Sequence, residues 1–223
     1  MKRSRHLSHA TLQDGVRALV GRDPWLAAIA ARWGMPPLWA RRPGFATLVH
    51  IILEQQVSLP AAATLYKRLA RHAGCMSPQA IAALGADGLR AFGLTRQKSA
   101  FCDALATRVL DGRLDLALVS RAPDAAARAM LLEVPGLGPW SVDIYFLMAL
   151  RRPDIWPQGD LALAVTLRDR LALPKSPGRV EQAAFAERWA PWRSVAARLL
   201  WLEYLATRGR YVVRPDSAAP TST

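Results

Sequence analysis

Apolar residues recur at steps of three and four along almost the whole chain, and no segment shows the strict alternation of a half-buried strand. The pattern therefore predicts an all-α protein. Proline and glycine mark where one segment ends and the next begins. Helices are expected over residues 23–33, 45–57, 60–73, a short stretch after 78, 95–110, 123–132, 139–150, 160–171, 177–188 and 191–208. Gly85 and Gly88 are expected to bound a small turn before Phe92, and Thr95 is expected to cap the helix that follows.

The segment from Val134 to Pro139 is the sharpest break in this pattern. Gly136 and Gly138 permit positive φ and close backbone approach, so the flanking helices are expected to form a hairpin. Pro139 suits the first position of the second helix. The small residues before it leave backbone N–H groups at the positive end of the helix dipole, which suits a phosphate and carries no base preference. An ordinary turn between helices is the alternative interpretation.

The net charge of +13 favours a polyanionic partner, because neutralising phosphates releases counterions. Nearly all of the positive charge is arginine, which binds phosphate through two hydrogen bonds. The only lysines are Lys2, Lys67, Lys98 and Lys175. Arginine enrichment also arises from genomic base composition, so charge alone does not decide between these causes.

The chain has 223 residues, of which 52% are hydrophobic, so it can bury a core as one domain or as two small lobes. Cys75 and Cys102 are too few for a disulfide framework or a four-cysteine iron–sulfur cluster. No apolar run reaches the ~18 residues of a membrane span, and the amino terminus lacks the apolar core of a signal peptide. We therefore expect a soluble, cytoplasmic protein with no membrane partner and no metal site.

Several motifs occur in order along the chain, and together they are far more specific than any one of them. They are Ile52 to Ser58, Gly93 to Lys98, Val134 to Trp140, Trp156 to Asp160, and Pro191 to Ser194 followed by Trp201. On these motifs the chain resembles the helix-hairpin-helix DNA glycosylases, and among them the 3-methyladenine DNA glycosylase II type. The resemblance implies two helical lobes around a DNA-binding cleft, with double-stranded DNA containing damaged bases as the partner.

The resemblance also sets expected boundaries. A composite terminal lobe is expected from residues 11–43 and 160–213, and a central lobe from residues 44–159 with the hairpin at 123–150. Residues 1–10, which are basic, and 214–223, rich in proline, serine and threonine, are expected to be disordered tails. Because helices begin almost at once, the amino-terminal β domain of some relatives is expected to be absent. A monomer associated with the nucleoid is expected.

Asp160 is the predicted catalytic residue. The family's catalytic aspartate lies about twenty residues after the hairpin position of Trp140, and Asp160 follows Trp140 by 20 residues. Cleavage of an N-glycosidic bond builds positive charge on the deoxyribose, which a carboxylate beside C1′ stabilises while it orients or deprotonates water. Asp160 also fits a helix N-cap, and the two roles are compatible. Asp143 and Asp154 are the alternative acids.

Trp140 discriminates between two mechanisms. In the bifunctional relatives the matching residue is a lysine, whose amine forms a Schiff base. Tryptophan at this position favours a monofunctional enzyme that uses water. By resemblance, Trp140 and Trp201 match aromatic residues that stack on the flipped base, where a cationic methylated purine gains roughly 0.5–2 kcal/mol from the indole. Core packing is the alternative for both tryptophans.

The loop after the helix at 45–57 matches the family region that inserts into the minor groove. Gln56 is the candidate wedge, and the alternative is that Gln55 or Gln56 caps or bridges helices. The hairpin residues Gly136, Gly138 and Pro139 are expected to contact the DNA backbone. No cofactor is expected to be required, although the resemblance suggests a monovalent cation held by hairpin carbonyls.

Three basic residues are further candidates for contacts with the DNA backbone. They are Arg96, Lys98 and Arg193, with a solvated surface charge or an ion pair as the alternative for each.

The predicted function is base-excision DNA repair, by hydrolysis of the N-glycosidic bond of alkylated purines such as 3-methyladenine and 7-methylguanine. Two alternatives stay open. One is a glycosylase for deaminated or oxidised bases, and the other is a non-catalytic helix-hairpin-helix protein that recognises DNA. A carboxylate at position 160 argues against the non-catalytic alternative.

Overall fold

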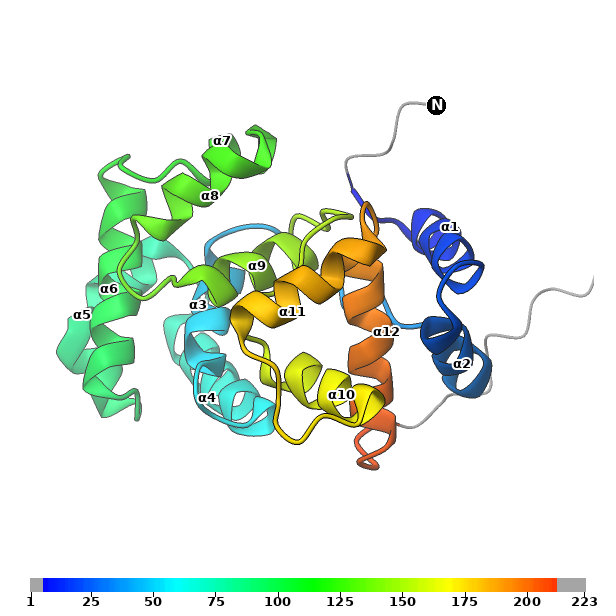
Figure 1. The fold of residues 1–223 in the computed structure, drawn as a ribbon. Helices are drawn as coiled ribbons and strands as arrows, with labels where there is room; N and C mark the ends of the chain where they lie inside the picture. Colours follow the sequence, from blue (N-terminus) through cyan, green and yellow to red (C-terminus); the bar gives the residue numbers. More distant parts are fainter. Residues whose placement is uncertain (1–5, 212–223) are drawn as a thin grey trace, which may run out of the picture. The chain divides into compact units, whose positions relative to one another are not determined.

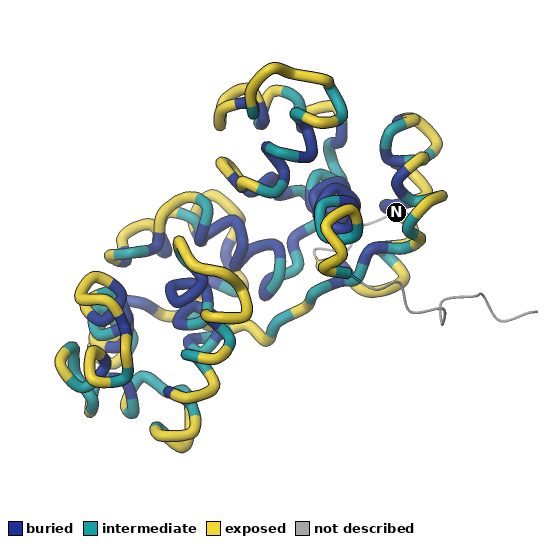
Figure 2. Tube along the Cα trace, turned by 90° about the horizontal axis from the view of Figure 1, so that it is seen from below, coloured by how far each residue is buried: buried dark blue, intermediate teal, exposed yellow. Residues whose placement is uncertain are grey.

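The computed structural model describes residues 6–211, and within them the chain forms twelve α-helices, one short 3-10 helix and no strand (Figure 1). The all-α class predicted from the apolar pattern is confirmed. The helices divide between two compact units. Figure 2 shows buried, intermediate and exposed residues alternating along many of the helices, as expected for helices with one buried face.

Unit 1 combines the two ends of the chain, Met1–Ala40 and Arg151–Thr223. Helix α12 is its centre, because every residue from 194 to 203 is buried. Helices α1, α2 and α10 and the 3-10 helix pack against it. The helices of unit 1 are α1 (His9–Val20), α2 (Pro24–Trp33), α10 (Leu161–Leu171), α11 (Arg179–Ala186), η1 (Glu187–Trp189) and α12 (Arg193–Ala206).

Unit 2 is the continuous segment Arg41–Leu150. Its helix α9 is buried at every residue from 141 to 147, and α3 packs against α4, α6 and α9. Helices α8 and α9 form the hairpin. The helices of unit 2 are α3 (Phe45–Glu54), α4 (Leu59–Ala73), α5 (Pro78–Ala91), α6 (Arg96–Leu110), α7 (Leu116–Arg121), α8 (Asp124–Leu132) and α9 (Pro139–Met148).

Short polar side chains cap many of the helices. Thr95 accepts a hydrogen bond from the backbone N–H of Lys98 at 3.2 Å, so the predicted cap of α6 is confirmed. Serine or aspartate side chains at the N-caps of α1, α2, α4, α5, α7 and α10 accept equivalent bonds. These caps satisfy N–H groups that lack partners inside the helix.

The amino-terminal segment differs from the expected tail in the part that the structure describes. Helix α1 begins at His9, after a capping box formed by Ser8 and Thr11. Leu7 is buried, and its N–H donates to the carbonyl of Arg151 at 2.6 Å. Residues 6–10 are therefore ordered by packing and capping. Residues 1–5 and the expected tail at 214–223 lie outside the described residues.

Two further details differ from the expected elements. Helix α7 was not predicted, and α5 continues through the turn expected at Gly85 and Gly88. Gly85, at φ +59°, kinks α5 without ending it, and Gly88 lies inside the helix.

The unit boundaries fall at 40/41 and 150/151, whereas the sequence placed them at 43/44 and 159/160. The crossover that follows Leu150 packs within unit 1, where the N–H of Ile155 donates to Ser194 Oγ at 2.9 Å. No helix in residues 6–211 is long and apolar enough to cross a membrane.

Candidate active site and helical hairpin

Asp160 is the N-cap of α10 in unit 1, and its exposed fraction is only 8%. Its Oδ1 accepts hydrogen bonds from the backbone N–H of Leu163 and from Trp201 Nε1, both at 3.0 Å. The two donors orient the carboxylate at the positive end of the α10 dipole. The structure therefore brings together two of the predicted site residues, Asp160 and Trp201.

Trp201 is buried in α12, and its ring meets the ring of Trp39 edge to face, with centroids 6.2 Å apart. Trp39 is half-buried and has φ +44°, a backbone conformation that is rare for a bulky residue. Arg198, fully buried one turn before Trp201, donates from Nε to the carbonyl of Leu38 at 3.1 Å. The position of Trp39 was not predicted, because no local pattern marks a tryptophan for positive φ.

The alternative acids lie in ion pairs. Asp143 is completely buried on α9 and pairs with Arg128 of α8, within the hairpin. Asp154 accepts from both Nε and Nη2 of Arg193 at 2.9 Å.

Arg193 was expected to contact DNA, but its guanidinium instead binds carboxylates of unit 1. In addition to its two bonds to Asp154, Nη1 donates to Glu187 at 2.6 Å. The hydrogen bonds and charge of Asp154 and Glu187 raise the pKa of Arg193. This network fastens the start of α12 to the crossover before α10.

Lys98 was also expected at the DNA backbone, and the structure places it elsewhere. Its side chain is largely buried, and Nζ donates to the carbonyl of Leu53 at 2.7 Å. This carbonyl lies in the last turn of α3, where it lacks a helical donor. Burial lowers the pKa of the Lys98 ammonium. Arg96, at the first position of α6, is exposed.

The two glycines of the hairpin loop differ. Gly136 has φ +88°, and a Cβ there would lie 2.2 Å from Phe101 Cγ, so the fold itself requires glycine. Gly138 has φ −79°, and nothing lies within 4 Å of a Cβ built on it. The positive φ expected for both glycines therefore occurs only at Gly136. Pro139 occupies the first position of α9, as predicted.

The loop after α3 is tied to the hairpin. Gln55 Nε2 donates to the carbonyl of Gly136 at 2.7 Å and to Ser141 Oγ at 3.0 Å. The next residue, Gln56, is exposed at φ +57°. Gln55 thus bridges elements, while Gln56 projects from the same loop, so two predicted DNA-binding elements of unit 2 are neighbours.

The N-terminus of α9 is open to solvent. No side chain caps this N-terminus, and Gly138 and Pro139 are exposed. In the loop after α3, Val57 is 46% exposed, and Leu59, the first residue of α4, is 59% exposed. Trp140, the second residue of α9, is half-buried and belongs to unit 2. Its stacking role stays a prediction.

Within residues 6–211, no three His, Cys, Asp or Glu side chains come together as a metal site. The monovalent cation suggested for the hairpin loop stays a prediction, and three carbonyls of that loop are its candidate ligands. Those of Val134, Gly136 and Gly138 each accept one hydrogen bond, which leaves a second lone pair on each oxygen.

An all-helical fold, a glycine-containing helical hairpin and a helix-capping aspartate held by a tryptophan define a helix-hairpin-helix protein of the base-excision repair class. Residues 49–191 match the family described as HhH-GPD superfamily base excision DNA repair protein. The chain belongs to this superfamily, and the resemblance seen in the sequence is confirmed.

The relatives include proteins named for 3-methyladenine. DNA-3-methyladenine glycosylase 2 of Escherichia coli (strain K12) is 28% identical over 186 residues, which are 74% of this chain and 62% of that protein. YfjP of Bacillus subtilis (strain 168) is 26% identical over 184 residues, which are 79% of this chain and 64% of YfjP. The chain therefore spans less than two thirds of the length of these two relatives.

Solved structures have the same fold. The crystal structure of a DNA-3-methyladenine glycosidase from Bacillus halodurans has a TM-score of 0.74 at 25% identity, covering 88% of this chain and 92% of that one. The Schizosaccharomyces pombe 3-methyladenine DNA glycosylase in complex with abasic DNA also has a TM-score of 0.74, at 21% identity, covering 89% and 99%. The second similarity concerns the fold alone.

Proposed function

We propose that this protein is a monofunctional DNA glycosylase that hydrolyses the N-glycosidic bond of alkylated purines, such as 3-methyladenine and 7-methylguanine, in double-stranded DNA. The observation that carries the proposal is the buried carboxylate of Asp160, oriented by Leu163 N–H and Trp201 Nε1. Membership of a base-excision repair superfamily and relatives named for 3-methyladenine support the substrate class.

In the proposed reaction, the bond between C1′ and the purine nitrogen breaks and its electron pair leaves with the base. The deoxyribose is then an oxocarbenium-like cation, which the negative charge of Asp160 stabilises. Water adds its oxygen to C1′ and gives up a proton, which Asp160 accepts directly or passes to solvent. The products are the free base and an abasic site.

Alkylated purines suit a site that offers one carboxylate. A purine methylated at N3 or N7 already carries a positive charge, so it leaves as a neutral base without a proton from the enzyme. An indole such as Trp140 would stack on this cation more strongly than on a neutral base. Such a site accepts several alkylated purines, because it selects for the positive charge of the base and not for hydrogen bonds to the edge of the base.

Hydrolysis by water, rather than through a lysine adduct, follows from the residues at the expected nucleophile position. Position 140 is tryptophan. Lys98 is hydrogen-bonded to the carbonyl of Leu53 inside unit 2. The other two lysines in the described residues, Lys67 and Lys175, are exposed and match no catalytic position of the family.

We assign DNA binding to the hairpin and its neighbouring loop in unit 2. The uncapped start of α9 suits a phosphate, and Gly138 is open enough for a DNA backbone to approach. Gln56 would fill the space that the flipped base leaves, and Arg96 would contact the backbone. A monovalent cation on the carbonyls of Val134, Gly136 and Gly138 would add positive charge beside the phosphate.

Asp160→Asn tests the proposal. Asparagine keeps an oxygen that accepts from Leu163 N–H and Trp201 Nε1, but it removes the negative charge. We expect base release from methylated duplex to slow by orders of magnitude, while unfolding temperature and duplex affinity stay near those of the parent. Asp169→Asn, an exposed aspartate of the same helix, is the matched control.

Release by Asp160→Asn at close to the parent rate would refute the assigned role of Asp160. Parallel assays with hypoxanthine-, uracil- and 8-oxoguanine-containing duplexes decide between alkylated bases and the deaminated or oxidised alternatives. If the parent protein binds duplex but releases no base from any of them, the non-catalytic function replaces the proposed one.

A further inference from the structure

Arg179, at the start of α11, lies against the backbone of the residue that precedes Asp160. Gly159 has φ +76°, and a Cβ on it would lie 2.9 Å from Arg179 Nε, 3.2 Å from Cγ and 3.4 Å from Cδ. The Arg179 stem therefore covers the open face of Gly159. Both residues belong to unit 1, and this contact places the guanidinium beside the loop that carries the candidate carboxylate.

The positive charge of Arg179 is available to a ligand. The residue is exposed, and no carboxylate within residues 6–211 pairs with it. The carboxylate nearest in sequence, Glu181, accepts from the N–H of Gly178 at 2.6 Å and so occupies the start of α11 itself. An anion at this place would therefore bind the Arg179 side chain rather than the helix amides.

The apolar residues that directly follow Asp160 and Arg179 in the sequence are also highly exposed. Leu161, directly after Asp160, is 71% exposed, and Val180, directly after Arg179, is 83% exposed. A ligand bound at Arg179 would have exposed apolar side chains available for contact on both sides of the Gly159–Arg179 contact.

We infer that Arg179 binds a DNA phosphate adjacent to the nucleotide on which Asp160 acts, an inference that rests on the proposed function. A flipped nucleotide stays bonded to its two flanking phosphates, so a carboxylate that reaches C1′ lies close to a phosphate. Arginine at that place offsets the repulsion between two anions and binds phosphate oxygens with two parallel hydrogen bonds. Gly159 contributes by leaving room for the arginine stem.

This role differs from that of the hairpin. Arg179 is a positioning residue, because it holds the sugar-phosphate backbone while Asp160 does the chemistry. It should therefore affect how tightly the lesion strand is held more than the maximal rate of base release. It should also matter more for DNA with a flipped or missing base than for undamaged duplex, since only the former brings C1′ to Asp160.

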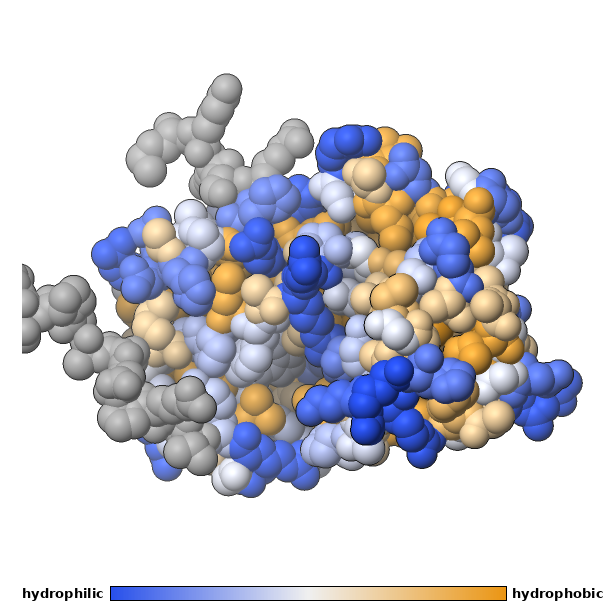
Figure 3. Space-filling view, turned by 180° about the vertical axis from the view of Figure 1, so that it is seen from behind, coloured by the Kyte–Doolittle hydropathy of each residue, from blue (hydrophilic) through white to orange (hydrophobic). Residues whose placement is uncertain are grey.

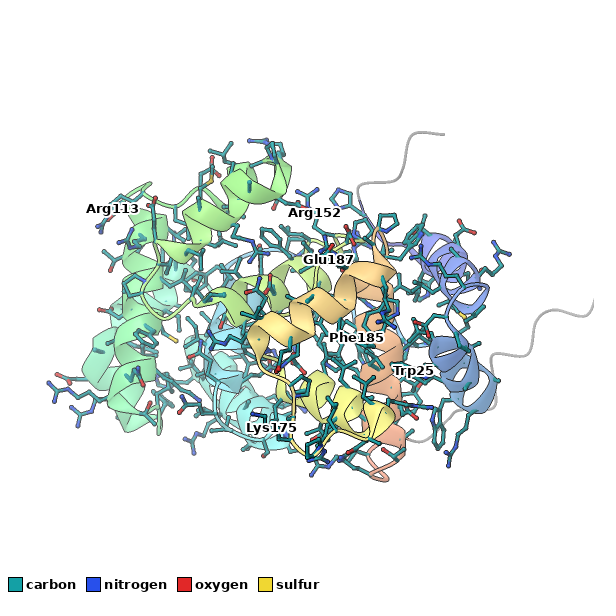
Figure 4. The ribbon with its side chains drawn as sticks, viewed as in Figure 1. Trp25, Arg113, Arg152, Lys175, Phe185 and Glu187 are labelled. Carbon is teal, nitrogen blue, oxygen red and sulfur yellow. The ribbon has the colours of Figure 1, made fainter. Side chains whose placement is uncertain are left out.

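The test compares Arg179→Gln, Arg179→Lys and Lys175→Gln with the parent. Lys175 is an exposed cation in the connection between α10 and α11 (Figure 4), so its removal changes the net charge equally without touching Gly159. Single-turnover base release from methylated duplex, measured against enzyme concentration, gives the half-saturating concentration and the maximal rate. Affinity for a duplex containing an abasic site is measured in parallel over a range of salt concentrations.

For Arg179→Gln we expect the half-saturating concentration to rise about tenfold, as for loss of a charge-assisted hydrogen bond, with the maximal rate nearly unchanged. The salt slope for abasic duplex should become shallower by about 0.9, the value for one phosphate contact. Arg179→Lys should restore part of the affinity, and Lys175→Gln should resemble the parent.

Equal effects of Arg179→Gln and Lys175→Gln would overturn the inference in favour of a general charge effect, and so would an unchanged salt slope in Arg179→Gln. If the parent releases no base, the proposed glycosylase activity fails. The abasic-duplex measurement still decides whether Arg179 holds a phosphate, because it requires no chemistry.

Discussion

The hydrogen bond from Trp201 Nε1 to Asp160 Oδ1 fixes how the buried carboxylate is oriented. Trp201→Phe keeps an aromatic ring in the core, although a smaller one, and removes this donor. We expect base release to slow by up to about 10²-fold, as for a reacting group displaced by about 1 Å, with little change in the half-saturating enzyme concentration. The free energy of unfolding should fall by about 1–3 kcal/mol, because a buried acceptor loses a donor.

Single-turnover kinetics and urea unfolding measure these two effects separately. A tryptophan that merely packs would lose stability with an unchanged rate, and that result would contradict the positioning role. Trp140→Ala provides the comparison, since loss of stacking should lower the release of cationic methylpurines by more than it lowers affinity for undamaged duplex.

The sequence predicted the roles of residues that act on their immediate neighbours in the chain, such as helix caps. The cap at Asp160 follows from the helix that begins after it, and the cap at Thr95 likewise. Lys98 and Arg193 were expected to contact the DNA backbone because the sequence shows only that they are positively charged. Their partners, the carbonyl of Leu53 and the carboxylate of Asp154, come from elements far along the chain, which no local pattern specifies.

His50 adds a pH dependence to unit 2. It stacks on Tyr66 with ring centroids 4.4 Å apart, and Nε2 lies 3.6 Å from Glu54 Oε1, while Arg41 binds both oxygens of Glu54. Burial lowers the pKa of His50 below 6.5, with Arg41 acting in the same direction and Glu54 opposing both. The unfolded chain therefore binds a proton more readily than the folded protein does.

Stability from His50 is present above pH 6.5 and is lost as the pH falls through the lowered pKa. We expect the free energy of unfolding to decrease over that range and the decrease to be smaller in His50→Phe, which retains a ring to stack on Tyr66. Urea titrations on both sides of pH 6.5 measure this. Identical pH profiles for the parent and His50→Phe would show that His50 does not contribute.

At the scale of elements, the hairpin offers a matched pair of glycine substitutions. Gly136→Ala introduces a Cβ that meets Phe101 at a positive φ, so we expect a loss of stability of about 1–3 kcal/mol or more. Gly138→Val meets open space at φ −79°, so we expect the fold to persist while affinity for all duplexes falls. Thermal unfolding and anisotropy titrations of each variant separate the two effects.

Unchanged DNA affinity in a folded Gly138→Val protein would remove the start of α9 from the interface. Residues in and beside the loop also explain why the hairpin could be predicted from the sequence. Pro135, Gly136 and Pro139 interrupt a helical pattern with strong local preferences, and α8 and α9 end and begin where those residues require.

Elements without such strong local signals were placed less well. The segment before α1 is held by the buried Leu7, whose N–H bonds to Arg151, a contact between segments far apart in the sequence. The kink in α5 at Gly85 looks like a turn in the sequence, since glycine permits both outcomes and only packing selects between them. A long-range contact therefore accompanies the order of the amino-terminal segment, which the local pattern did not predict.

The composition of the whole molecule agrees with the family but does not identify the site. A net charge of +13 indicates a polyanion, and Figure 3 shows strongly hydrophilic side chains interspersed with apolar ones over the face opposite to that of Figure 1. The net charge nevertheless overestimates the number of contacts with DNA phosphates, because arginines such as Arg128 and Arg193 are already paired with carboxylates. The arginines that remain unpaired are those that would release counterions from DNA.

This distinction predicts how salt affects binding and chemistry. The dissociation constant for undamaged duplex should rise steeply with salt, with a log–log slope near −0.9 for the association constant per phosphate contacted, and should depend little on sequence. The rate of base release at saturating enzyme should stay nearly constant, because Asp160 and Trp201 are buried and their hydrogen bond is screened far less than exposed charges are. Anisotropy titrations and single-turnover assays over the same salt series measure both quantities. A rate that falls in parallel with affinity would mean that surface charge acts in the chemical step, and salt-independent affinity would mean that phosphates are not the main ligand.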